Sequence, residues 1–189
     1  TLGMDYARVT YYDSEITKKV SAVSNNVLEK TNTITWKVNA WETATSGSGK
    51  AEYIKQDSGI FYDLIPTGGE IDLDTVQVET EKGYLEENEY SYEVVSNYKN
   101  SGRTMLIVKI SEQAEYFTVY YNTVHSWDSI KDYGRNVLNP VAYETGNEKI
   151  TNGYEDNGGA LSQSNKEMFT NLDEATDDKK FIYAEQSYN

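Results

Sequence analysis

Short stretches in which apolar and polar residues alternate recur along most of this chain. The stretch NTITWKVNAWE places Ile34, Trp36 and Val38 on one face of a strand, because successive side chains of a β-strand point to opposite sides. Similar alternation occurs in DTVQVET, YSYEVVS, TMLIVKIS, YFTVYYNTV and NVLNPVAYET. Turn sequences such as TSGSGK, PTGGE and KNSGR separate these stretches. The pattern predicts an all-β fold in which two sheets pack as a β-sandwich.

The composition agrees with a sheet protein and excludes several partners. Tyrosine is abundant at 17 residues against 4 phenylalanines, and tyrosine suits half-exposed sheets. The net charge of −14 disfavours nucleic acid and anionic membranes, which are both polyanions. The longest aliphatic run, MLIV, is too short to insert into a membrane. The chain has no cysteine, which a cytosolic protein may lack by chance, whereas an exported protein without cysteine needs a large core or a different covalent link.

The chain divides into a central sandwich and two flanks. We expect the sandwich over residues 14–150, with residues 1–13 as the end of a preceding module or a linker. Residues 151–189 read as an extension that leads to the next module. Within the sandwich, SWDSIKDYG predicts a short helical insertion that begins after Ser126 and ends at Gly134.

Both ends of the chain carry the pattern Tyr-Ala-x-x-x-Tyr, which starts at Tyr6 and at Tyr183. We interpret the chain as one period of a tandem array, in which the end of each module leads into the next. The alternative is two unrelated edge strands in a tyrosine-rich chain.

Three polar residues lie on strand faces that are otherwise apolar: Lys18, Asp63 and Asn139. Each has an apolar residue two positions before it and two positions after it. Burying such a residue alone is costly, but three of them on different strands can stabilise one another if they meet. Lys19 would face inward in place of Lys18 if a bulge shifted the register.

The order of these segments resembles repeat domains of Gram-positive adhesins, pilins and long cell-wall stalks, akin to collagen-adhesin A-type domains. The resemblance covers roughly Ser14 to Thr145 and rests on ITKKV, NTITWKVNAWE, FYDLIPTGGEIDLDTVQVET, TMLIVKIS, FTVYYNTV and NVLNPVAYET. It implies an immunoglobulin-like β-sandwich. It also implies an intramolecular isopeptide bond between Lys18 on the first strand and Asn139 on the last, with Asp63 as the assisting acid.

Burial would favour that chemistry. Desolvation lowers the pKa of a lysine and raises that of an aspartate, and only a neutral amine is a nucleophile. A protonated Asp63 could polarise the amide of Asn139, and Lys18 would then displace ammonia in a single self-modification. Alternatively, Lys18 extends to the solvent at a sandwich edge. Asp63 would then only begin the turn at Pro66, and Asn139 would only be held extended by Pro140.

The remaining polar clusters carry weaker signals. The single histidine, His125, stands beside Ser126 and reads as structural, because a catalytic triad needs groups that converge from distant positions. Acidic residues cluster at 72–74, 155–159 and 173–178 and could bind calcium through their oxygens. None has the spacing of an EF-hand, so we expect solvated loops and no cofactor.

We therefore predict a structural stalk module of a bacterial cell-surface adhesin or pilus-like protein. It would be extracellular, anchored to the cell wall through parts outside this chain, in contact with neighbouring modules of the same chain, and not an enzyme. The alternative is a ligand-binding adhesin module that recognises a host protein or glycan. Trp127 is then the candidate binding residue, since Trp36 is expected in the core and Trp41 at the end of its strand.

Overall fold

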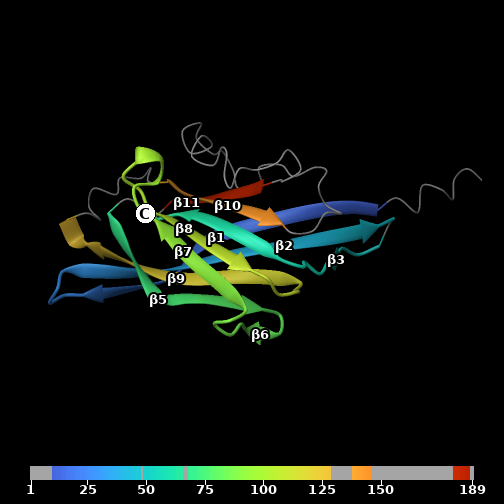
Figure 1. The fold of residues 1–189 in the computed structure, drawn as a ribbon, viewed down its shortest axis with the longest axis horizontal. Helices are drawn as coiled ribbons and strands as arrows, with labels where there is room; N and C mark the ends of the chain where they lie inside the picture. Colours follow the sequence, from blue (N-terminus) through green and yellow to red (C-terminus); the bar gives the residue numbers. More distant parts are fainter. Residues whose placement is uncertain (1–9, 48, 66–67, 129–137, 146–180, 188–189) are drawn as a thin grey trace, which may run out of the picture.

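The computed structural model describes residues 10–47, 49–65, 68–128, 138–145 and 181–187 of the chain. These residues form two antiparallel β-sheets that pack face to face (Figure 1). The strands are β1 (Thr10–Asn26), β2 (Thr31–Ser46), β3 (Glu52–Tyr53), β4 (Gly59–Leu64), β5 (Gly69–Thr80), β6 (Gly83–Tyr84), β7 (Tyr90–Val95), β8 (Met105–Ile110), β9 (Tyr116–Ser126), β10 (Leu138–Thr145) and β11 (Phe181–Ser187), and a short 3₁₀ helix, η2 (Tyr98–Asn100), lies between β7 and β8. The all-β sandwich predicted from the alternation is confirmed.

The first sheet has the strand order β1-β2-β9-β5-β6, and β3 pairs with the end of β2. Its longest feature is the hairpin of β1 and β2, which are paired from Thr10 opposite Ser46 to Asn26 opposite Thr31. One irregularity interrupts this register, between Val20 and Ala22. Strand β9 lies on the other side of β2, so β2 is enclosed by neighbours on both edges.

The second sheet has the order β11-β10-β4-β8-β7. Its strands cross those of the first sheet at an angle (Figure 1). On one side of the sandwich β11 lies beside β1. On the opposite side β7 lies near β5 and β6 (Figure 1), and the Tyr90 hydroxyl on β7 donates a hydrogen bond to the Val76 carbonyl on β5 at 3.2 Å.

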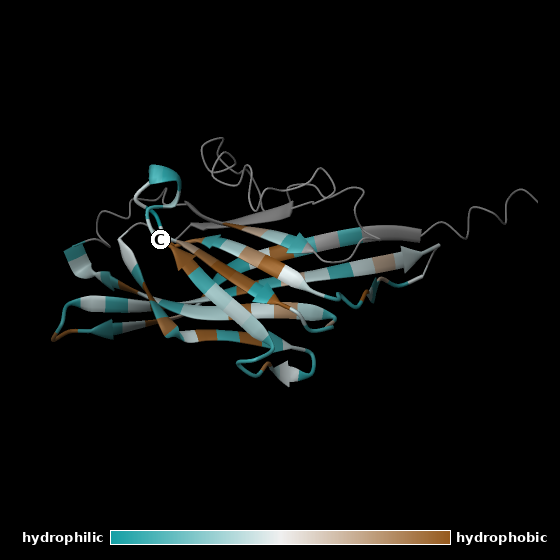
Figure 2. Cartoon of the chain, viewed as in Figure 1, coloured by the Kyte–Doolittle hydropathy of each residue, from teal (hydrophilic) through white to brown (hydrophobic). Residues whose placement is uncertain are grey.

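The main core fills the space between the sheets. Hydrophobic residues gather where the sheets overlap, and the ends of the long strands are hydrophilic (Figure 2). The largest buried side chains of this cluster are Trp36, Phe61, Phe117, Tyr121 and Tyr143. Trp36 is fully buried, as its place in the alternation predicts.

A second, smaller cluster forms around Tyr62, Leu64, Met105 and Ala142. Residues 61 to 64 of β4 are all buried, so both faces of this strand pack against other residues. The Tyr62 hydroxyl donates a hydrogen bond to Glu144 Oε2 at 3.0 Å. A strand that is buried on both faces is held rigidly, and β4 carries Asp63.

Strands from both predicted flanks join the sandwich, since β1 begins at Thr10 and β11 pairs with β10. The division of the chain into modules stays a prediction, as does the tandem repeat, because Tyr6, Ala7 and Tyr188 lie outside the described residues. Of the predicted helical insertion, Trp127 and Asp128 have helical backbone, and residues 129–137 lie outside the described residues. Within the described ranges, no helix has the length and apolar character needed to cross a lipid bilayer.

Candidate functional site

The structure places Lys18, and not Lys19, in the core. Lys18 is opposite Val38 in the β1–β2 register, and the irregularity of this hairpin follows Val20, so the alternation through Ile16 and Lys18 is unbroken. The Lys18 residue is 3% exposed, whereas Lys19 on the other face is exposed to solvent. The question that the sequence left open between the two lysines is thereby answered.

Lys18 meets Asp63 between the two sheets. The Lys18 Nζ lies 2.6 Å from Asp63 Oδ1, and the Asp63 residue is 2% exposed. Lys18 belongs to β1 of the first sheet and Asp63 to β4 of the second, so the pair bridges the sandwich. The Lys18 Nζ also lies 5.0 Å from the ring centroid of Trp36, close enough for a cation–π contact if the amine is charged.

Burial changes the pKa of both partners in opposite directions. Desolvation lowers the pKa of Lys18 from 10.5, and the Asp63 carboxylate only partly opposes this effect. Desolvation likewise raises the pKa of Asp63 from 3.8, and Lys18 only partly opposes it. Both shifts favour a neutral amine beside a protonated acid, which is the pairing that nucleophilic attack by a lysine requires.

Tyr121 completes this buried polar group. Its pKa is raised well above 10.0, first by burial and then by the charge of Asp63, so the hydroxyl keeps its proton. Neither this hydroxyl nor Asp63 Oδ2 has a hydrogen-bond partner of good geometry among the described residues. Tyr121 therefore lies close to Asp63, whose charge contributes to the raised pKa of the tyrosine hydroxyl.

Asn139 is close in register to this group. It lies in β10, where its Cα partner on β11 is Gln186. Two residues further along β10, Val141 is paired with Asp63. Two strand residues span about 7 Å. The side chain of Asn139 lies outside the described residues, so its role stays a prediction.

His125 on β9 is buried in the first sheet and belongs to a hydrogen-bond network other than the Lys18–Asp63 pair. The Trp36 Nε1 donates a hydrogen bond to Thr123 Oγ1 at 2.9 Å, and this hydroxyl lies 2.7 Å from His125 Nε2. Burial lowers the pKa of His125 to about 4, which favours the neutral imidazole at neutral pH. A Cβ added to Gly69 would lie 2.5 Å from His125 Cε1, so the backbone of Gly69 packs directly on the ring.

Trp127 is 39% exposed. It is held against the start of β2, where its Nε1 donates to Asn32 Oδ1 at 3.0 Å and its backbone N–H donates to the Lys30 carbonyl. Trp36 is in the core, and Trp41 is opposite Tyr116 near the far end of β2. The three tryptophans therefore do not form one stacking platform.

The acidic clusters give no metal centre in the described part of the chain, where no group of three or more His, Cys, Asp or Glu side chains is placed to hold an ion. Residues 155–159 and 173–178 lie outside it. Within 72–74, Asp72 Oδ1 accepts a hydrogen bond from the Asp74 N–H at 3.2 Å.

The sequence analysis did not single out Tyr121, although a signal for it was present. Along YFTVYYNTV, Phe117, Val119 and Tyr121 share one face, and all three are buried. The alternation therefore indicated that Tyr121 points inward, but it could not indicate that the hydroxyl approaches an acid on the opposite sheet.

The described residues thus form an all-β sandwich with a buried lysine–aspartate pair between its sheets. No protein-family model matches the chain, and no curated protein matches it.

Solved structures similar to the chain include Gram-positive surface proteins. The major pilin SpaA of Corynebacterium diphtheriae, whose modular pilus assembly is described as having stabilizing isopeptide bonds, is 12% identical, with 69% of this chain and 31% of that chain covered and a TM-score of 0.44. The T6 backbone pilin of Streptococcus pyogenes serotype M6 is 14% identical over 92% of this chain and 35% of that chain, with a TM-score of 0.44.

ACE19, the collagen binding subdomain of the Enterococcus faecalis surface protein ACE, is 11% identical over 92% of this chain and 96% of that chain, with a TM-score of 0.40. The chain spans about a third of the length of the two pilins.

Proposed function

We propose that this chain is a structural module of a Gram-positive cell-surface protein, and that an isopeptide bond between Lys18 and Asn139 links its two sheets. The observation that carries the proposal is the buried contact of 2.6 Å between Lys18 Nζ and Asp63 Oδ1. A buried ion pair contributes little net stability compared with apolar residues of the same size, so its presence in a well-packed core calls for a chemical explanation.

The proposed reaction uses each member of the group once. Asp63 takes a proton from the Lys18 ammonium, and the neutral Nζ attacks the side-chain carbonyl carbon of Asn139. The protonated Asp63 donates a hydrogen bond to the developing oxyanion. A new C–N bond forms, the bond to the Asn139 amide nitrogen breaks, and that nitrogen leaves as ammonia with the proton that Asp63 returns. The second proton, which Nζ loses as it becomes an amide nitrogen, then passes to Asp63, so that the acid ends protonated. The rigid core supplies the proximity that the reaction needs.

Such a bond would suit a module that bears load outside the cell. It would join β1 to β10, which belong to different sheets, so the sheets could not separate under tension. It also needs no cysteine, of which the chain has none. On this proposal the module is extracellular, its partners are neighbouring modules of the same protein, and it catalyses no turnover.

Intact mass spectrometry tests the proposal directly. We expect the purified protein to be lighter than its sequence mass by one ammonia. Lys18→Ala and Asn139→Ala should each restore the full mass expected for the variant. The matched control is Lys19→Ala, next in the chain but exposed, which should keep the deficit. A wild-type mass equal to the sequence mass would refute the bond and leave Lys18 and Asp63 as a hydrogen-bonded pair.

A ligand-binding adhesin module is the second candidate function. It is favoured by the exposed ring of Trp127 and by exposed tyrosines on the first sheet, Tyr53 at 53% and Tyr84 at 61%. Aromatic rings of this kind suit stacking against sugars or peptides. A screen against glycans and matrix proteins, repeated with Trp127→Ala, tests it. Binding that is lost in this variant would support the second candidate, and a spacer should bind nothing.

A further inference from the structure

Strand β7 is an edge strand whose outer side is open. It ends the order of the second sheet and pairs with β8 from Tyr90 to Val95 without a register shift. Residues 91 to 95 are all exposed. Alternate residues of an edge strand direct their N–H and C=O groups away from the sheet. Within the described ranges, no backbone hydrogen bond joins residues 91–95 to any segment other than β8.

This edge lacks the features that usually block strand pairing. Strand β5 of the first sheet, which lies near β7, differs from it in this respect. Its pairing with β9 is irregular between Asp72 and Gln77, where Thr75 Oγ1 donates to the Asp72 carbonyl at 2.6 Å. A bulge of this kind protects an edge strand from pairing with a further strand. The sequence of β7, YSYEVV, contains no proline or lysine, and Glu93 is its only charge. Strand β7 therefore keeps its capacity to pair.

A groove runs beside the open edge, between β7 and the irregular part of β5. It has a volume of about 420 Å³ and is lined by Leu73, Asp74, Val76, Glu87, Tyr90, Ser91 and Tyr92. The Tyr90 and Tyr92 rings stack with centroids 6.4 Å apart. The lining thus combines apolar and aromatic side chains with two carboxylates and has no basic side chain.

We propose that β7 and this groove bind an extended polypeptide segment of alternating apolar and basic residues, which adds to the second sheet as a further strand. The open backbone groups would hold the segment, and every second side chain would enter the groove. Lysine or arginine in those positions would pair with Asp74 and Glu87. The segment would belong to a partner protein.

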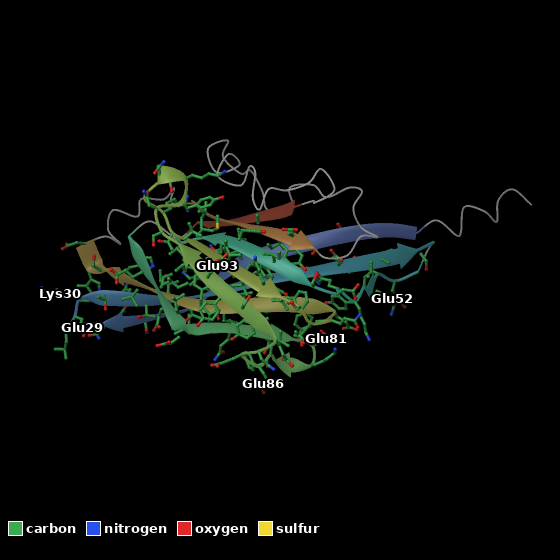
Figure 3. The ribbon with its side chains drawn as sticks, in the orientation of Figure 1. Glu29, Lys30, Glu52, Glu81, Glu86 and Glu93 are labelled. Carbon is green, nitrogen blue, oxygen red and sulfur yellow. The ribbon has the colours of Figure 1, made fainter. Side chains whose placement is uncertain are left out.

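The charge of the chain argues against a second copy as the occupant. Two β7 strands paired with each other would bring their Glu93 side chains together, and each chain carries a net charge of −14. Figure 3 shows Glu81 and Glu86 near β6 and Glu93 on β7, whereas Glu29 and Glu52 lie at distant ends of the first sheet. The distant pair supplies control positions.

The experiment uses a fluorescein-labelled peptide of about nine alternating valine and lysine residues, which is long enough to span β7. Binding is measured by fluorescence anisotropy, and hydrogen exchange maps the site. A second peptide is N-methylated at two successive central residues, which blocks both of its edges. The protein variants are Asp74→Asn with Glu87→Gln, and the control pair Glu29→Gln with Glu52→Gln.

We expect the unmodified peptide to bind, to protect the amides of residues 91–95 from exchange, and to lose binding when N-methylated. The groove variant should weaken binding by about fivefold, since each exposed pair contributes modestly, and the control variant should not weaken it. Absence of binding, equal binding of the N-methylated peptide, or equal weakening by both variants would overturn the proposal. Self-association with protection of residues 91–95 would assign the edge to a second copy and would also overturn it.

Discussion

Acidification should destabilise this protein through one residue, His125. Its side chain is fully buried, and burial lowers its pKa from 6.5 to about 4. Between these two pH values the unfolded chain binds a proton that the folded chain does not. The stability is therefore fully present above about pH 6.5 and is lost as the pH falls toward 4. Protonation would also make both ring nitrogens donors, at a site where His125 Nε2 lies 2.7 Å from Thr123 Oγ1.

The size of the effect follows from the shift. A fall of roughly 2.5 pKa units corresponds to a loss of at most about 3 kcal/mol in the free energy of unfolding. We expect about 2 kcal/mol, because His125 is close to the exposed residues 126–128, where water can partly solvate a charged ring.

The assay benefits from there being a single histidine in the chain. An NMR titration of its ring reports the folded pKa without overlap. Chemical denaturation of the wild type and of His125→Gln, at a series of pH values from about 7 to 4.5, then isolates its contribution. The wild type should lose about 2 kcal/mol relative to the variant over this range. An NMR pKa at or above 6.5, or parallel loss of stability in both proteins, would refute the reasoning.

Three further predictions concern the core and are checked by chemical denaturation. Asp63→Leu should lower the free energy of unfolding by about 3–5 kcal/mol, because Lys18 then remains a free amine without its buried partner. Adding Lys18→Met should recover the part of that loss that the unpaired amine causes, and a double variant no more stable than the single one would contradict this. Gly69→Ala should cost about 1–3 kcal/mol, because its Cβ would lie 2.5 Å from the His125 ring, and unchanged stability would show that the ring moves freely. Leu106→Ala, at a fully buried site, should lower the free energy of unfolding by about 2–5 kcal/mol. Leu28→Ala, at a site that is 96% exposed, should change it by less than about 0.5 kcal/mol, and equal losses in the two variants would contradict the assignment of Leu106 to the core.

Local sequence periodicity was sufficient to predict most of the longer strands, but not the two-residue strands β3 and β6. The stretches that contain Ile34, Val78, Val108 and Val119 all fold as strands, and these residues are buried, because a period of two directs them to the core. The choice between Lys18 and Lys19 could not be made in the same way. It depends on where the β1–β2 hairpin shifts its register, and that shift follows Val20.

The site could be predicted only in part for a related reason. Alternation indicated that Lys18 and Asp63 face inward, but their meeting depends on which strands oppose each other across the sandwich. The neighbours of β4 are β8 and β10, which follow it by many residues in the chain. Such pairing is non-local, and no local pattern records it. The approach of Tyr121 to Asp63 was missed for the same reason.

The burial of Lys18 and Asp63 favours the product of the proposed reaction over its reactants. While Lys18 and Asp63 remain separate titratable groups, each ionised form suffers a desolvation penalty in the core, as the opposite shifts of their pKa values indicate. An amide between Lys18 and Asn139 cannot be protonated near neutral pH, and a protonated Asp63 beside it is neutral as well. The bond would therefore remove the charge from the core instead of only balancing it. The same burial that makes the lysine reactive would thus make the product more stable than the reactants, and the release of ammonia to solvent would keep the reaction from reversing.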